Sequence, residues 1–200
     1  MATAIALSPV QVGSKAAEFM KLIREWPGFE RFVESTKMYP DCWASFEGYP
    51  CIAKWNLATD GDPLFEEALR LLCLKGAVMH LTGDELKSEL PASGPVDEMV
   101  HAIIAQVSSM FAIHTHTGMP IVHSTDMEAV SFQYYGPYNP GCITDELYAT
   151  AGWGTPNPRF WLSYDVIQAR RAQLGELYKE IGIHNGGRSH DISFAEPTVA

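Results

Sequence analysis

Apolar residues recur three and four positions apart in several stretches of this sequence, and this spacing constrains the fold more than any other feature. It places one face of a helix in a core. Ser14 is expected to cap the first such helix, whereas Asp62 and Pro63 predict the start of a long central one. The stripes are Phe19, Leu22, Ile23 and Trp26 in the first helix, and Leu69, Leu72, Cys73, Val78 and Leu81 in the second.

Two further helices are predicted from their end signals. Ser93 to Pro95 combines a cap with a first-turn proline, and we expect that helix to reach Thr117 and end at Gly118. Ser163 predicts the cap of a last helix that Gly182 would end. Its expected buried stripe is Tyr164, Ile167, Leu174, Leu177, Tyr178 and Ile181.

The remaining segments are rich in aromatic residues, proline and glycine. Residues 38–63 lack a sustained helical period and have room for a brief strand, whereas 134–142 and 152–161 are typical of ordered loops that line a site. The sequence therefore predicts a mainly α protein, a compact irregular helical bundle with long aromatic and Pro/Gly loops. We expect a single helical domain over 1–183 and a flexible C-terminal tail over 184–200.

The net charge and the length of the apolar runs limit the kinds of binding partner that we expect. The formal net charge is -10 over 200 residues, which repels phosphate backbones and anionic lipid, so we expect neither nucleic-acid nor membrane binding. No apolar run approaches the ~20 residues that span a bilayer, and the first residues lack a secretory signal. These features predict an acidic, soluble, cytoplasmic protein with reduced cysteines. Cys42 and Cys51 would close a short disulfide loop only in an oxidising compartment.

The histidines are the main functional signal, because four of the seven fall between positions 101 and 123. Asp97 and His101 are four residues apart and so project from one helix face. The chain then turns back after Gly118, which would bring His123 to the same helix. Two histidines and one carboxylate are a ligand set that holds iron(II). Glu98 and His101 also form the Glu-x-x-His pair of di-iron proteins, but no second copy is present.

The same residues also have structural interpretations. Asp97 lies in a first helical turn, where a carboxylate is favourable whatever the function, and His101 can be a core histidine bonded to it. His114 and His116 are further candidate metal ligands, or they interact with exposed carbonyls at the helix end. His80 is expected in the core. Glu66 and Glu67 are expected to be surface charges.

Other chemistries lack their motifs. Ser108 and Ser109 lie inside a predicted helix and form no nucleophile elbow, and no cysteine has a base beside it in the sequence. The glycines form neither a P-loop nor a dinucleotide-binding fingerprint. The sequence therefore gives no support to phosphate or dinucleotide cofactors.

Residues 62–126, about one third of the chain, resemble the helical domain of glycine-rich domain-containing proteins of plants, fungi and bacteria. That family has a leucine-rich helix, Pro-Ser, Val-Asp-x-x-Trp-His, an aromatic residue and then Gly before a His. The residues on this pattern are Pro91, Ser93, Val96, Asp97, His101, Phe111, Gly118 and His123. Val100 stands in place of the tryptophan, Phe111 in place of the usual tyrosine, and the glycine-rich region is absent. The resemblance implies that Asp97, His101 and His123 share one site, and it names no reaction.

These observations favour a small enzyme, in specialised metabolism, that acts on an organic small molecule through Asp97, His101 and His123. In a metal version the three are ligands of Fe(II) or Zn(II); in a metal-free version there is no cofactor and His101 is the general acid or base, oriented by Asp97. The rival is a non-catalytic protein-interaction module, which exposed Trp153, Phe160 and Trp161 would favour. A homo-oligomer is compatible with either.

Overall fold

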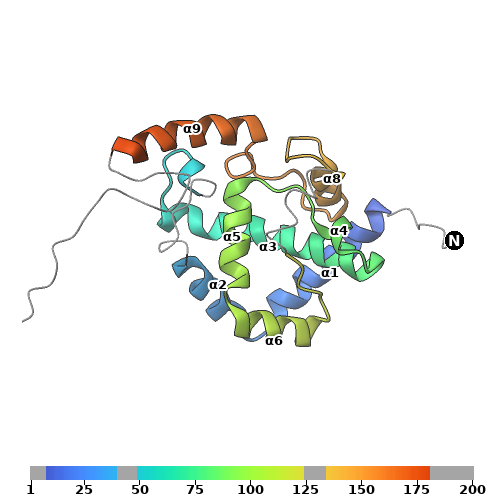
Figure 1. Ribbon diagram of the computed structural model, residues 1–200. Helices are drawn as coiled ribbons and strands as arrows, with labels where there is room; N and C mark the ends of the chain where they lie inside the picture. The colour runs from blue at the N-terminus through green and yellow to red at the C-terminus, as the bar shows by residue number, and fades with distance from the viewer. Residues whose placement is uncertain (1–7, 40–48, 124–133, 181–200) are drawn as a thin grey trace, which may run out of the picture.

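Helix α3 (Leu57–Thr82) is the element around which the other helices pack (Figure 1). The computed structural model describes residues 8–39, 49–123 and 134–180. Every regular secondary-structure element within these residues is a helix, which confirms the mainly α fold. The brief strand expected in 38–63 is not found in the described part of that segment, which contains the 3-10 helix η2 (Tyr49–Cys51). Cys42 and the predicted tail lie outside the described residues.

The central helix begins earlier than predicted. Asn56 is its N-cap, and its side chain accepts a hydrogen bond from the Ala58 N–H at 3.0 Å. Pro63 therefore lies inside the helix rather than in its first turn. Arg159, which lies outside the helix, holds this end by donating to the carboxylate of Asp60 in the first turn, through Nε at 2.7 Å and through a terminal nitrogen at 2.8 Å. Sequence spacing alone does not reveal this contact, because Asp60 and Arg159 are 99 residues apart.

Helices α1 (Pro9–Glu25) and α2 (Phe29–Met38) cover one side of α3. α1 begins at Pro9, so Ser14 is an interior residue rather than the predicted cap. The buried apolar face of α1 comprises Val12, Ala16, Phe19, Met20 and Ile23. Of the predicted stripe, Phe19 and Ile23 are buried, whereas Leu22 and Trp26 are half-buried.

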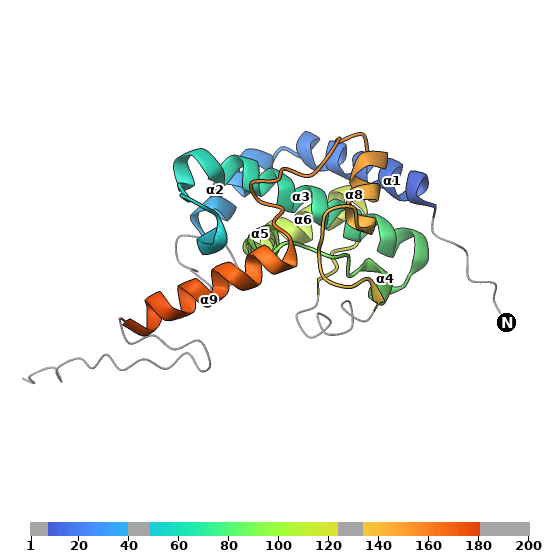
Figure 2. The same ribbon diagram turned by 90° about the horizontal axis from the view of Figure 1, so that it is seen from above.

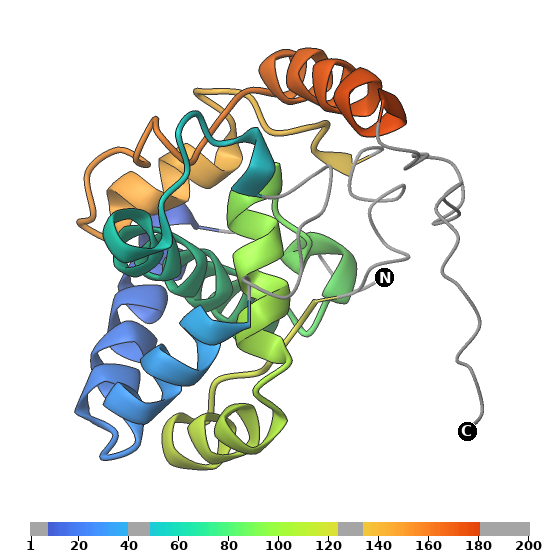
Figure 3. The same cartoon turned by 90° about the vertical axis from the view of Figure 1, so that its left-hand side faces the viewer.

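The helix predicted from Ser93 to Thr117 is two helices, α5 (Gly94–Ile104) and α6 (Val107–Thr117), bent by 87°. Neither glycine nor proline marks the break at Ala105 and Gln106, so the continuous apolar pattern conceals it. The bend lets α5 pack on α3 while α6 packs on α1. In Figures 1 and 3, α6 lies at one end of α5 and α9 (Tyr164–Glu180) lies near the other.

The aromatic loops are part of the core. The loop that contains Tyr138 leads into the short helix α8 (Ile143–Thr150), and the Tyr135 hydroxyl links it to the short helix α4 (Glu85–Ser88) by donating to the Lys87 carbonyl at 3.0 Å. A second loop carries Phe160 and Trp161. These three side chains are at most 4% exposed. Glu67, expected at the surface, is buried beneath them; its carboxylate accepts from the Tyr148 hydroxyl at 2.5 Å and from the Trp161 indole at 2.7 Å.

Helix α9 departs most from its prediction. Only Ile167 of the expected stripe is buried, whereas Leu177 is 58% exposed. Figure 2 shows the reason: α9 runs along the edge opposite α1, on the far side of α3. Ile181 and Gly182 lie outside the described residues. Among the described helices, none is by itself both long and apolar enough to cross a bilayer; only the bent pair of α5 and α6 reaches the required length and composition.

Candidate active site

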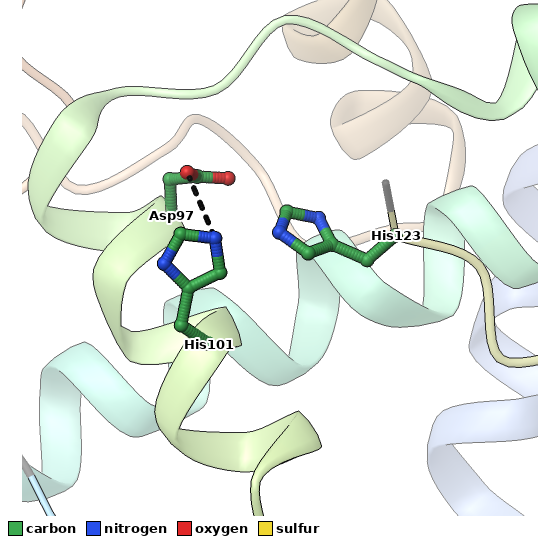
Figure 4. A group of neighbouring side chains, drawn as sticks. All are labelled: Asp97, His101 and His123. Atoms are coloured by element: carbon green, nitrogen blue, oxygen red, sulfur yellow. Dashed lines mark ion pairs between the residues drawn. The ribbon is translucent and has the colours of Figure 1, made fainter. Parts of the chain in front are cut away.

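Asp97, His101 and His123 come together on the described structure (Figure 4). One ligand atom from each lies within 4.8 Å of the other two. Asp97 and His101 belong to α5, whereas His123 belongs to the segment that returns after α6. Figure 4 shows the two imidazole rings and the carboxylate facing one shared region.

The start of α5 fixes the first two residues. Ser93 is the N-cap residue, as predicted, but its hydroxyl accepts from the Leu162 N–H at 2.9 Å instead of capping the helix. This bond ties α5 to the loop before α9. The four-residue spacing then brings His101 Nε2 to 3.6 Å from the Asp97 carboxylate, and Nδ1 to 3.7 Å from that of Glu98. Both are ion-pair separations rather than hydrogen bonds.

His123 is placed by a close approach between its segment and α3. Gly118 ends α6 with a φ of 69°, as predicted for a glycine at this position. Met119 is then held by His114, whose Nδ1 donates to its carbonyl oxygen at 2.8 Å. A Cβ at Gly76 would lie 2.7 Å from Met119 Cγ and 2.9 Å from the Pro120 carbonyl oxygen. Glycine at position 76 is therefore what allows the segment to lie against α3.

Lys75 and Glu89 form a buried ion pair behind His123. Lys75 Nζ donates to the Glu89 carboxylate at 2.6 Å, and the two side chains are 2% and 6% exposed. Lys75 Nζ also lies 3.2 Å from His123 Nδ1. The other ring nitrogen of His123, Nε2, is buried and has no hydrogen-bond partner among the described residues.

The two histidines have opposite electrostatic environments. The Glu98 carboxylate raises the pKa of His101 above its ordinary 6.5, and Asp97 adds to this effect, although partial burial opposes it. Burial lowers the pKa of His123 to about 4, and the positive charges of Lys75 and His101 contribute. Burial also raises the pKa of Asp97, although about a third of its side chain remains exposed.

The arrangement suits two kinds of chemistry. The ring centroids of His101 and His123 are 4.7 Å apart, so one small group can contact both. A protonated His101 can donate a proton, and Asp97 can accept one. The same atoms also approach a metal site: ligands ~2.0–2.2 Å from a tetrahedral ion are roughly 3.3–3.6 Å apart, close to the Asp97–His101 separation. The three ligand atoms, which lie within 4.8 Å of one another, would have to move closer together to bind one tetrahedral ion.

The other predicted residues lie elsewhere. His114 and His116 are exposed on α6 and are not part of the group. His80 was expected in the core but is exposed, with its ring edge against Phe19. Glu66 is half-buried and pairs with Arg24 and Arg70. Phe111 is 73% exposed and contributes nothing to the site, because the bend before α6 turns it away from α5.

Sequence reasoning missed Lys75 and Glu89. The available signal was a single lysine inside the apolar run Leu71 to Val78, where every other side chain larger than glycine is apolar. A buried lysine in such a run needs an acidic partner. That partner, 14 residues away, is visible only once the chain is folded.

Comparison of the chain with protein-family models, curated proteins and solved structures finds no match, so the assignment of function rests on the geometry of the site.

Proposed function

We propose that this chain is a small-molecule enzyme in which Asp97, His101 and His123 carry out acid–base chemistry. The observation that supports it is the pair of imidazole rings 4.7 Å apart, one beside two carboxylates and the other against a buried ammonium. Neighbouring groups whose environments push their pKa values apart are typical of acid–base catalysts.

His101 is the proton-transfer residue in this proposal. The carboxylates of Asp97 and Glu98 orient its ring from two sides and stabilise its protonated form. Its side chain is 29% exposed, so a substrate can reach it. His123 completes the site from the opposite side. The substrate is a small organic molecule, and we place the reaction in specialised metabolism.

A metal centre is the second candidate. It is favoured by the three ligand atoms within 4.8 Å and by Glu98, which stands behind His101 as carboxylates stand behind metal-bound histidines. Asp97, His101 and His123 would hold Fe(II) or Zn(II) and leave positions open for water or substrate. The Lys75 ammonium beside His123 disfavours this candidate, because it adds positive charge next to the cation.

A non-catalytic interaction module lacks the feature that would favour it. Phe160 and Trp161 are buried, at 1% and 3% exposure, and Trp153 is half-buried. The burial of Phe160 and Trp161 therefore supports a role for these two side chains in stabilising the fold.

Metal analysis and activity of the same variants test the proposal. The protein is purified without a histidine tag as wild type, His101→Gln and His123→Gln, with His116→Gln as the matched exposed control. We expect the wild type to contain no metal. We also expect His101→Gln to lose about 10²–10⁴-fold in turnover, measured on a panel of small carbonyl compounds and esters. Near-stoichiometric metal that both site variants lose would establish the metal candidate instead. Equal turnover by wild type and His101→Gln would contradict catalysis by His101.

A further inference from the structure

The buried pair Lys75–Glu89 determines which nitrogen of His123 carries the proton. An ammonium group has three donors and no acceptor. Lys75 Nζ lies 3.2 Å from His123 Nδ1, so Nδ1 must accept the hydrogen bond. A neutral imidazole that accepts at Nδ1 carries its single proton on Nε2. Glu89, 2.6 Å from Lys75 Nζ, keeps the ammonium in place.

The Nε2–H bond of His123 points into the candidate active site. Nε2 is buried and has no hydrogen-bond partner among the described residues. An unpaired buried N–H is destabilising, and a bound acceptor would remove that cost. Figure 4 shows the ring edge away from the backbone turned toward His101 and Asp97. The unpaired Nε2–H donor of His123 and the proposed proton-transfer residue His101 therefore face the same region.

We propose that the Lys75–Glu89 pair holds His123 as its Nε2–H tautomer, and that this N–H donates to a carbonyl oxygen of the substrate. The inference rests on the proposed acid–base function for its substrate and goes beyond it by assigning His123 a separate task. His123 polarises the carbonyl while His101 and Asp97 move protons. Lys75 and Glu89 are positioning residues, since they act through His123.

The charges around the site favour a carbonyl oxygen over an anion or a metal ion. Among the described residues, the three carboxylates of Asp97, Glu98 and Glu89 lie near two cations, Lys75 and protonated His101. A further anion would thus enter a site that already has excess negative charge. A metal ion would need the lone pair of Nε2, which the proton occupies in this tautomer.

Imidazole nitrogen NMR of the full chain tests the tautomer directly. Wild type is compared with the charge-swap variant Lys75→Glu/Glu89→Lys, which keeps the ion pair and net charge but places a carboxylate beside Nδ1. We expect the Nε2–H form in wild type and the Nδ1–H form in the swap. The Nδ1–H form in wild type, or an unchanged tautomer in a folded swap, would overturn the proposal.

A second variant keeps the test decisive if the charge swap fails to fold. Lys75→Met/Glu89→Leu replaces the ion pair by hydrophobic side chains, a change that buried pairs often tolerate. The Nε2–H population of His123 should fall below that of wild type, because no donor remains at Nδ1. An unchanged population in this variant would overturn the proposal as well.

The ligand class is tested with two probes of equal ring size. Cyclopentanone, which only accepts hydrogen bonds, should shift the Nε2 resonance of His123, whereas cyclopentylammonium, which only donates, should not. A larger shift with cyclopentylammonium, or none with either probe, would overturn the carbonyl assignment. These readouts need no turnover, so failure here is distinguishable from failure of His101 catalysis: His101→Gln should lose activity and leave the His123 tautomer unchanged.

Discussion

His101 and His123 are side chains of the same type in two different electrostatic environments. His101 lies between Asp97 and Glu98 on its own helix, and these carboxylates favour its charged form. His123 is held against α3, where burial and the Lys75 ammonium favour its neutral form. The rings are close enough to act on one molecule. Under the proposed function, these environments would let His101 act as the acid and His123 as the hydrogen-bond donor.

The low pKa of His123 predicts an acid-dependent loss of stability. Between pH 6.5 and about 4 the unfolded chain binds a proton at this residue and the folded chain does not, so the free energy of unfolding falls as the pH falls. The loss should be on the order of 1–3 kcal/mol, given the partial exposure of the ring. His101 has a raised pKa and acts oppositely: its contribution is full below pH 6.5 and is lost at higher pH.

Urea unfolding at a series of pH values measures this contribution. His123→Gln should flatten the pH dependence between pH 6.5 and 4, since the variant cannot take up the proton. His116→Gln changes an exposed histidine on α6 and should keep the wild-type slope in that window. Parallel slopes for wild type and His123→Gln would show that His123 is not held neutral by the fold.

At the scale of elements, the site depends on contact between α3 and the segment after α6. Gly76 is the point of closest approach, because its missing side chain leaves room for Met119 and the Pro120 carbonyl. Lys75, its neighbour, then reaches His123. A glycine within a long helix ordinarily costs about 0.5–1 kcal/mol relative to alanine, so its presence here has a packing reason.

Gly76→Ala should separate this segment from α3. The added methyl group clashes with a backbone oxygen, and we expect destabilisation of about 1–3 kcal/mol together with loss of the Lys75–His123 contact. Thermal unfolding and the imidazole NMR signals measure the two effects.

Gly175→Ala is the matched control, a helix-interior glycine of α9 with open space around it. It should be stabilising by about 0.5–1 kcal/mol, since only the unfolded chain loses freedom. Equal effects of the two substitutions would argue against a steric role for Gly76.

The elements also show what the sequence could predict. Local signals correctly placed the N-cap position of α5 at Ser93 and the end of α6 at Gly118, because a first-turn proline and a left-handed glycine act within a few residues. The 87° bend between them escaped prediction, since it arises from packing on α3 and α1 and no helix breaker marks it. Asp97, His101 and His123 were predicted as one group and lie together, whereas Lys75 and Glu89 depend on burial that only the fold creates.

At the scale of the whole molecule, burial among the described residues is greatest in the central helix α3 and least in α9. α3 is buried along most of its length, and Glu67 within it anchors Tyr148 and Trp161 from distant parts of the chain. α9 has one buried side chain, Ile167, and is held to η2 by a hydrogen bond from Arg170 to the Cys51 carbonyl. The molecule therefore combines a rigid centre with a peripheral helix.

Hydrogen exchange should reveal this gradient. Amides of α3 are expected to exchange only on global unfolding, whereas those of α9 exchange through local opening of much lower free energy. The measurement is residue-resolved exchange by NMR, with and without low urea concentrations. Similar protection of α9 and α3 would contradict the peripheral placement of α9.

The Lys75–His123 contact joins residues 48 positions apart, whereas Lys75 and Glu89 are separated by only 14. Loop closure costs more entropy for the longer separation, so the ion pair can form early and the histidine docks onto it late. During refolding, the signal of the His123 ring should consequently be among the last to become native. A chain interrupted before that step would have its core and its ion pair, but His123 would not yet have joined Asp97 and His101.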